Sequence, residues 1–332
     1  MKPALFGSAL AIGLGAASLQ AAAQDRPQFT VYAPDYFASS WGPGPKIQEG
    51  FEAICECDLV FVTGDVLPRI LLEGEGTRAD AVIGLNTDVM ARARASGLFA
   101  PHGQDTSDLT MPVEWDDEVF LPFNWSQVAF VYDENRLDEA PTSFEALLDA
   151  PDDLSIIIQD PRAAVSGLAL LLWVKAIYGD AAGEAWERLA PKVLTVTQGW
   201  SEAYGMFTDG EADMVLSFTS SPAYHIMAEN ETNYHAAIFD EGHYLYVETA
   251  ARIGGSIKPE LGKQFMEYIL SDDFQSMIAE ANWSFPAKLD EAEWPDVFRE
   301  LPQPERTIHL SEREAESLRQ PALNEWLTAL SR

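Results

Sequence analysis

A chain of 332 residues exceeds what one hydrophobic core usually holds, so we expect two domains. Its 53 acidic residues outweigh 21 basic ones and give a formal net charge of −32, which argues against nucleic acid or an anionic membrane surface as a partner. The same excess favours cationic ligands, although adaptation to salty surroundings would explain it equally well.

The first 23 residues have the layout of a secretory signal peptide. Lys2 precedes an apolar, small-residue run over residues 4–19, which is shorter than the roughly 20 apolar residues of a membrane anchor. Small residues at the −3 and −1 positions predict cleavage between Ala23 and Gln24. No cysteine follows closely enough for a lipoprotein anchor, and charges interrupt every later apolar run. We therefore expect a soluble, periplasmic protein with no membrane insertion.

Strand and helix patterns alternate along the rest of the chain. Short apolar runs predict strands at Phe29–Tyr32, Leu59–Val62, Ala81–Leu85, Val128–Tyr132, Leu154–Ile158, Leu194–Thr197, Met214–Ser217 and Tyr244–Thr249. Helical spacing predicts helices at Val66–Glu73, Thr87–Ala95, Ser143–Leu148, Ala163–Tyr178, Ala182–Ala190, Trp200–Thr208 and Ser221–Glu229, with mostly helix after Pro259. Repeated strand–helix units predict a largely parallel α/β architecture.

No flexible linker or internal repeat divides the chain, so we expect two lobes joined by strands that cross between them. The crossings are placed near residues 123–131 and 247–254. Lobe 1 would then be discontinuous, formed by residues 24–124 plus 250–332, and lobe 2 would be residues 125–249, with 1–23 as the signal peptide.

The two cysteines, Cys55 and Cys57, are separated by a single residue. The periplasm permits a disulfide, but in an extended strand this separation lies near the upper limit of bridgeable geometry, so a bond would need a bend. Two free thiols are the alternative. The five histidines are scattered, and neither they nor the cysteines pair at ligand spacing, so no metal site is predicted.

Enzyme motifs are missing from the sequence: it has no G-x-S-x-G, H-E-x-x-H, Walker loop or G-x-G-x-x-G after a strand. Four tryptophans instead lie beside turn or loop residues: Trp41, Trp125, Trp200 and Trp283. Each alone could be a packing residue, as expected of the helical Trp173 and Trp186. Together, at the element ends where an α/β cleft gathers its contacts, the four favour stacking on a planar cation.

Hydroxyl side chains follow the strand that ends near Phe218. Thr219, Ser220 and Ser221 precede Pro222, which is expected at the first position of a helix. Ser220 or Ser221 could simply cap that helix, and the free N–H groups there could also bind a hydroxyl or phosphate.

Two aspartates and a second strand–helix junction complete the candidates. Asp35 and Asp65, each just beyond a strand, are best placed to face a cation, although turn or cap roles are the alternative for both. The junction at residues 159–167 resembles the one after Phe218, but only Ser166 offers a hydroxyl there.

Together these segments resemble the thiamine-binding periplasmic proteins of bacterial ABC importers, over essentially the whole mature chain. The marks are Thr30–Tyr32 with Asp35, Trp41–Pro45, Gln159–Arg162, Gly199–Gly205, Thr219–His225, Glu241–Leu245, Asn282 with Trp283, and the Cys-x-Cys. The resemblance implies a type II periplasmic binding protein fold whose two α/β lobes close on thiamine. It also implies an ABC transporter permease in the inner membrane as partner, no cofactor and no catalytic residue, and we expect a monomer.

The resemblance also implies a ligand-contact set. Stacking is expected from the residues that match the family's aromatics, Trp200, Tyr224 and Trp283, with Trp41 as a further wall. The other expected contacts are Asp35, Gly64, Asp65, Ala164, Val165, Phe218, Thr219, Ser220, Ser221 and Pro222.

Three departures from the family pattern affect this set. Pro34 replaces a tyrosine expected just before Asp35, and the loop around Gly64 and Asp65 is shorter than expected. Residues 164–165 are Ala-Val in place of a Ser-Thr pair, which removes two hydroxyls from the place where a phosphate would be held. We therefore expect free thiamine to be preferred over its phosphates.

Two alternatives stay open. One keeps the binding role with another small cation: a thiamine precursor, a polyamine or ferric iron. The other is a thiaminase-like enzyme, since secreted thiaminases resemble this family and use a cysteine nucleophile. Glu56 and Asp58 beside the cysteines would raise the pKa of a thiol there and blunt its reactivity.

Overall fold

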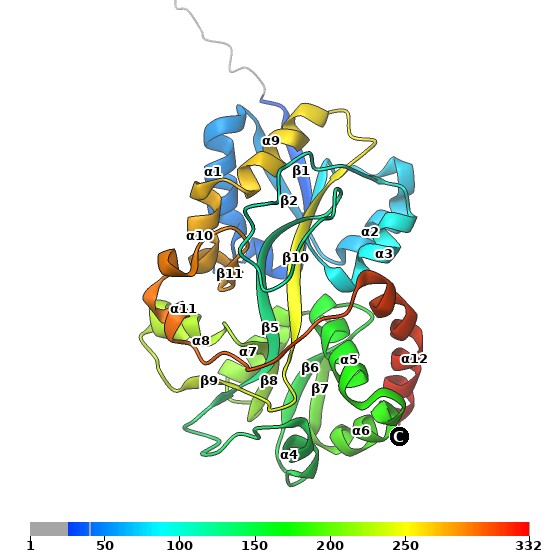
Figure 1. The fold of residues 1–332 in the computed structure, drawn as a ribbon, viewed down its shortest axis with the longest axis vertical. Coiled ribbons are helices and arrows are strands. Elements are labelled where there is room, and N and C mark those ends of the chain that lie inside the picture. The colour runs from blue at the N-terminus through cyan, green and yellow to red at the C-terminus, as the bar shows by residue number, and fades with distance from the viewer. Residues whose placement is uncertain (1–25, 40, 332) are drawn as a thin grey trace, which may run out of the picture.

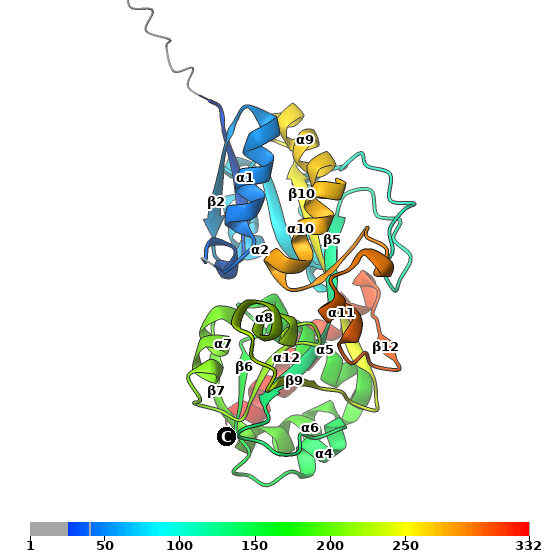
Figure 2. The same ribbon diagram turned by 90° about the vertical axis from the view of Figure 1, so that its left-hand side faces the viewer.

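The computed structural model describes residues 26–39 and 41–331. The predicted signal peptide and its cleavage site lie outside these residues. Figure 1 and Figure 2 show two α/β bodies, one above the other, joined by two long strands, β5 (Leu121–Asp133) and β10 (His243–Ile253). Both predicted crossings fall on these strands. The exact lobe boundaries remain a prediction.

The described strands form one 12-stranded sheet with the main order β2-β1-β3-β10-β5-β8-β6-β7. The remaining strands on this path are β1 (Gln28–Ala33), β2 (Asp58–Thr63), β3 (Ala81–Asn86), β6 (Ile156–Gln159), β7 (Val193–Thr197) and β8 (Met214–Phe218). Four short strands pair beside β5 or β10: β4 (Phe99–Ala100), β9 (Tyr234–Ala237), β11 (Phe285–Pro286) and β12 (Thr307–Ile308).

The strand directions divide the sheet into two parallel units. In the upper body β1 runs parallel to β2 and β3, and in the lower body β6 runs parallel to β7 and β8. An antiparallel β5–β10 pair joins these units, because β10 is antiparallel to β3 and β5 is antiparallel to β8. Parallel neighbours need a helical crossover, which accounts for the alternating strand and helix patterns in the sequence.

Helices cover both faces of the sheet. Their bounds are α1 (Gly44–Cys55), α2 (Val66–Glu73), α3 (Thr87–Ala95), α4 (Phe144–Asp149), α5 (Val165–Tyr178), α6 (Ala182–Leu189), α7 (Trp200–Thr208), α8 (Pro222–Tyr224), α9 (Pro259–Ile269), α10 (Asp272–Asn282), α11 (Asp296–Glu300) and α12 (Glu312–Leu330). Serine caps start three of them: Ser143 and Ser271 each accept a backbone N–H, and Ser311 forms a capping box with Glu314. The predicted helix at 221–229 is instead the short α8 followed by a π-helical turn, His225–Glu229.

The hydrophobic core is continuous through both bodies on one face of the sheet. A single cluster there joins Ile70 and Leu85 of the upper body to Trp173 and Trp326 of the lower part. On the other face the cores are separate, one around Phe29 in the upper body and one around α7 in the lower body. The bodies are therefore packed together on one face and have independent cores on the other.

The C-terminal helix α12 lies against both bodies. It packs on α5 and α6 of the lower body and on α3 of the upper body. Lys175 of α5 and Glu325 of α12 form an ion pair of 2.6 Å. Although the sequence places residues 250–332 with lobe 1, this last part of the chain bridges the two bodies.

One sequence-based expectation about membranes is corrected. Residues Val165–Lys192, which contain α5 and α6, are helical, long and apolar enough by composition to span a membrane. Charges are expected to interrupt every such run, and Lys175 and Asp180 do lie in this one, but the helical stretch still reaches spanning length. However, 61% of the apolar window is buried inside the protein, as in the core helix of a soluble fold.

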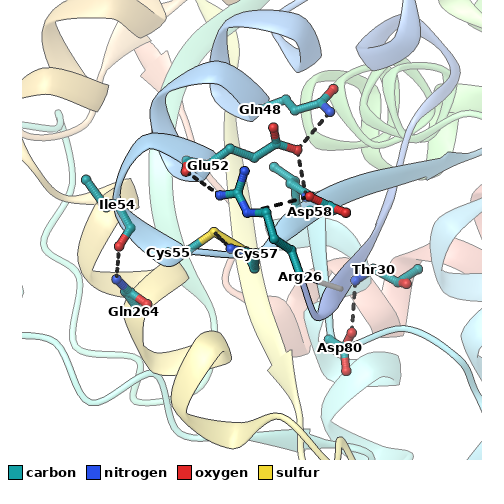
Figure 3. Close-up of a disulfide and its surroundings, with 11 residues drawn as sticks. Arg26, Thr30, Gln48, Glu52, Ile54, Cys55, Cys57, Asp58, Asp80 and Gln264 are labelled. Carbon is teal, nitrogen blue, oxygen red and sulfur yellow. Dashed lines mark hydrogen bonds and ion pairs between the residues drawn. A yellow bond between two sulfur atoms is a disulfide. The ribbon is translucent and has the colours of Figure 1, made fainter. Parts of the chain in front are cut away.

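Figure 3 shows the Cys-x-Cys segment at the end of α1. Cys55 and Cys57 form a disulfide with a Cα–Cα distance of 5.1 Å. The required bend is at Glu56, whose φ of 49° places it in the left-handed region. Arg26 donates to the carbonyl of Glu52 nearby at 2.8 Å. The disulfide alternative is therefore the one that the structure adopts.

Candidate ligand-binding site

A cavity of ≈ 1070 Å³ lies between the two bodies. Its walls come from the loops and helix starts at the ends of the strands, where open α/β sheets form ligand crevices. Of the expected contact residues, those on its lining are Asp35, Trp41, Gly64, Asp65, Ala164, Val165, Trp200, Phe218, Ser221, Tyr224 and Trp283. The fold brings these positions together although they are spread over most of the chain; their contacts with a ligand remain a prediction.

Three expected contact residues lie behind the wall instead of on it. Thr219, Ser220 and Pro222 are buried and do not line the cavity. The Thr219 hydroxyl donates to Oε1 of Gln127 at 3.2 Å, and Ser220 shares a 2.9 Å hydroxyl–hydroxyl bond with Ser126. These two hydroxyls hydrogen-bond the turn between β8 and α8 to side chains of β5.

Aromatic rings from the two bodies meet across the cavity. The rings of Trp41 and Trp200 have centroids 5.5 Å apart, and those of Tyr224 and Trp283 are 5.2 Å apart. Tyr204 stacks on Trp200 at 4.6 Å with an interplanar angle of 20°. In this conformation the upper and lower aromatic walls are close together, so stacking faces are available from both bodies.

Trp125 does not belong to this aromatic set, which corrects the expectation for the four tryptophans. It lies inside β5, is only 6% exposed, and stacks on Phe285 with centroids 4.6 Å apart. Its role is packing of the sheet.

A chain of hydrogen bonds through two serine hydroxyls orients the indole ring of Trp200. Its indole N–H donates to Ser217 Oγ at 3.0 Å, and Ser217 shares a 2.7 Å bond with Ser221. Ser221 Oγ also accepts the N–H of Phe218 at 3.2 Å. Ser221 takes the position before α8 but accepts no capping N–H, so the capping alternative for this serine is wrong.

Both predicted aspartates reach the cavity. Asp35 approaches the start of α7 so closely that a Cβ on Gly199 would lie 2.9 Å from its Oδ2, so the absence of a side chain at Gly199 permits this contact between the bodies. Asp65 precedes α2 and makes no side-chain capping bond. Gly64 beside it has φ 138°, a conformation that favours glycine.

The start of α5 forms another part of the wall. Ala164 occupies the N-cap position without a side-chain bond, and Val165 and Ser166 follow it along the cavity. Arg162 also lines the cavity, but its Nε donates to both carboxylate oxygens of Asp160, at 2.8 and 3.1 Å.

A buried carboxylate that the sequence analysis missed stands on the cavity wall. Glu248, on β10, accepts hydrogen bonds from the Tyr36 hydroxyl and from Asn282 Nδ2, the latter at 2.6 Å. Burial raises the pKa of Glu248 above its ordinary value, and hydrogen bonding with Tyr36, Asn124 and Asn282 acts in the opposite direction. The only sequence signal was a single acid within the apolar run from Tyr244 to Ala251.

The charge of the cavity lining is mainly negative. Its seven carboxylates are Asp35, Asp65, Glu202, Asp209, Glu229, Glu231 and Glu248, and its three guanidinium groups are Arg92, Arg162 and Arg319. Glu248 is the one buried side chain in this charged set. The electrostatics therefore favour a cationic or amino-bearing ligand.

Comparisons with known proteins agree with this geometry. The sequence profile of the family described as bacterial extracellular solute-binding protein matches residues 78–315. Thiamine-binding periplasmic proteins of Brucella abortus and Escherichia coli are 45% and 43% identical, over 95% and 92% of this chain and 95% and 94% of their own lengths. A solved periplasmic thiamin binding protein superimposes with a TM-score of 0.90 at 43% identity, covering 92% of this chain and 97% of that one.

These matches confirm the expected α/β, type II periplasmic binding protein fold and the periplasmic location. The matching family and relatives are solute-binding proteins and not enzymes, as expected. This chain belongs to the bacterial extracellular solute-binding protein family, within the group of its thiamine-binding periplasmic relatives.

Proposed function

We propose that this chain binds thiamine in the periplasm and delivers it to the permease of an ABC transporter. The observation that carries the proposal is the cavity in which aromatic walls from both bodies flank the buried Glu248 carboxylate. Thiamine carries a planar cationic thiazolium ring and a planar aminopyrimidine ring, so it can use both the stacking faces and the carboxylate. The names and high identity of the relatives support the same ligand.

Closure accounts for delivery without any chemistry in the protein. The two bodies are joined by β5 and β10, and ligand contacts come from both of them. A ligand that bridges the walls therefore stabilises the closed form, which the permease would recognise. The exported chain is proposed to begin at Gln24 and to act as a monomer, which N-terminal mass measurement and light scattering of the secreted protein would check.

A tryptophan fluorescence titration tests the ligand. We expect strong quenching by thiamine and none by ferric iron or spermidine, because Trp41, Trp200 and Trp283 lie on the cavity wall. Trp200→Ala and Trp283→Ala should each weaken thiamine binding by roughly tenfold, as loss of a stacking face of about 1–2 kcal/mol requires. Trp125→Phe, outside the cavity, is the matched control. A flat thiamine trace, or unchanged affinity in both cavity variants, would overturn the proposal.

Preference for free thiamine over its phosphates follows from the start of α5. Ala164 and Val165 offer no hydroxyl to a phosphate, so these two positions contribute only backbone N–H groups, and Ser166 is the one hydroxyl side chain left at this helix terminus. In the double variant Ala164→Ser with Val165→Thr, the affinity for thiamine monophosphate should rise several-fold relative to thiamine. Comparable affinities of the unchanged protein for thiamine and its mono- and diphosphate would contradict this preference.

The thiaminase alternative lacks a nucleophile. Cys55 and Cys57 are the only cysteines of the sequence, they are joined in a disulfide, and neither lines the cavity. Thiamine should therefore be recovered intact after long incubation with the protein, as measured by chromatography.

A further inference from the structure

At the rim of the cavity, three metal-ligating side chains converge. One nitrogen of His225 and one carboxylate oxygen each from Glu229 and Glu231 all lie within 4.8 Å of one another. Both glutamates also line the cavity. The spacing is not one of the common metal-binding patterns, which is why the sequence analysis predicted no metal site.

The backbone brings these three residues together locally. His225–Glu229 form a π-helical turn, and Asn230 then adopts φ 59° in the left-handed region. This reversal allows the N–H of Glu231 to donate to the carbonyl of His225 at 3.0 Å. Single π-helical turns are rare in proteins and are frequently found at functional sites.

The imidazole ring of His225 is held in one orientation. The ring is buried and stacks on Tyr234 with centroids 3.8 Å apart and an interplanar angle of 21°. Its Nε2 shares a 2.9 Å hydrogen bond with the Tyr204 hydroxyl. The other nitrogen, Nδ1, points to Glu229 Oε2 at 2.6 Å. An outer hydrogen bond that fixes the ring of a histidine is typical of metal ligands.

The negative charge of the carboxylates around the His225 ring is not balanced by ion pairs with basic side chains. Among residues 26–39 and 41–331, neither Glu229 nor Glu231 forms an ion pair with lysine or arginine. Asp133 adds a further negative charge that acts on His225. Two neighbouring carboxylates without a counter-ion repel each other, and a divalent cation between them would remove that repulsion.

We infer that His225 Nδ1, Glu229 and Glu231 form a binding site for a divalent transition-metal ion, of which Zn²⁺ is the best match. One imidazole and two carboxylates provide the nitrogen and oxygen ligands that Zn²⁺ accepts, whereas Ca²⁺ and Mg²⁺ prefer oxygen alone. On binding, the proton of the neutral imidazole moves from Nδ1, where it faces the Glu229 carboxylate, to Nε2, which then donates to the Tyr204 oxygen. The fourth coordination position would face the cavity and hold water.

Isothermal titration of the exported, chelator-treated chain with ZnCl₂ tests this site, without thiamine present. We expect one Zn²⁺ per chain. His225→Asn and the double variant Glu229→Gln with Glu231→Gln should each weaken binding by at least tenfold. The double variant changes only exposed side chains, so it tests the site even if His225→Asn fails to fold.

His235→Asn is the matched control, because its exposed ring pairs with a single carboxylate, Glu134, at 3.1 Å. It should bind Zn²⁺ like the unchanged protein. Equal Zn²⁺ uptake by the unchanged protein and the double glutamine variant would overturn the proposal, and so would binding of CaCl₂ in preference to ZnCl₂. The site goes beyond the proposed function, and its failure would leave thiamine binding untouched.

Discussion

Glu248 is a buried carboxylate whose partners are neutral. Tyr36 and Asn282 donate to it, and no lysine or arginine of the described residues forms an ion pair with it. Keeping such a charge away from water is unfavourable unless it gains further interactions. A cationic ligand that closes the cavity over Glu248 would supply them.

Glu248→Gln should therefore weaken thiamine binding by roughly thirtyfold, about 2 kcal/mol, because the shape is kept while the charge and one acceptor oxygen are lost. Because burial raises the pKa of Glu248 above 4.5, the affinity of the unchanged protein should fall as the pH is lowered through this raised value. The variant should show a flatter profile. Titrations between about pH 4 and 7 measure both effects, with the exposed Glu267→Gln as control; identical profiles would refute the role of Glu248.

Asp88 is a second buried carboxylate, placed at the start of α3. It accepts from the Tyr244 hydroxyl at 2.6 Å and from Asn86 Nδ2 at 2.8 Å. Burial nevertheless raises the pKa of Asp88 from 3.8 to about 6, because the charged form is poorly solvated there. Between these values the folded state binds more protons than the unfolded state, so the free energy of unfolding falls as the pH rises.

Burial of the charged Asp88 carboxylate therefore lowers the free energy of unfolding by about 3 kcal/mol above pH 6. Asp88→Asn, which cannot ionise, should remove this pH-dependent loss. Relative to the unchanged protein, the variant should become more stable as the pH increases from about 4 to 7. Urea unfolding at several pH values across this window measures the difference. A constant difference between the two proteins over the whole range would show that Asp88 titrates normally.

At the scale of elements, α12 connects the two bodies through buried and charged contacts. Lys175 on α5 has a side chain only 8% exposed, and its ammonium group pairs with Glu325, which is 26% exposed. Glu325→Gln would leave a buried ammonium group without its counter-charge, so we expect the free energy of unfolding to fall by about 2–4 kcal/mol.

Lys175→Met should be compared with Glu325→Gln, because it removes the other member of the ion pair. It removes the buried ammonium charge, and the Glu325 side chain that stays behind is 26% exposed, so the loss should be smaller than in Glu325→Gln. Denaturant unfolding of both variants gives the comparison. Equal losses would mean that the ion pair contributes through the geometry of α12 and not through the burial of charge.

Local sequence signals predicted many elements, including the bounds of α2, α3 and α7, because hydrophobic periodicity and turn residues act over a few neighbours. The strand predicted at Val128–Tyr132 was too short, because β5 begins at Leu121 and includes the polar residues Asn124, Ser126 and Gln127. These polar residues are buried in the sheet, where β5 is paired with β10. Pairing partners far along the chain thus decided the structure of this segment.

The residues of the candidate site likewise include some that the sequence predicted and others that only the fold reveals. Resemblance and loop position placed Trp200, Tyr224 and Trp283 on the cavity wall, as the structure has them. Tyr36 and Glu248, separated by 212 positions, meet only because η1 (Asp35–Ala38) and β10 are brought together by the sheet. No local pattern encodes such a contact, so the buried carboxylate could be found only in the fold.

For the whole molecule, the net charge of −32 acts on both binding and stability. The cavity lining is itself mostly acidic, so the long-range field and the local field attract the same kind of ligand. Self-repulsion of the many surface carboxylates opposes the compact state at low salt. Two explanations of the acidic surface, steering of cationic ligands and adaptation to salt, can therefore be distinguished experimentally. They predict different effects of ionic strength on the association rate of the ligand.

Raising NaCl from about 10 mM to 1 M shortens the Debye length from roughly 30 Å to 3 Å. The association rate of thiamine should then fall several-fold, because steering by the acidic surface is screened, while its dissociation rate changes little. The free energy of unfolding should rise over the same range, because the self-repulsion is screened too. Stopped-flow fluorescence and urea unfolding measure these quantities. A salt-independent association rate combined with rising stability would assign the acidic surface to salt adaptation alone, and leave recognition of the cation to the cavity.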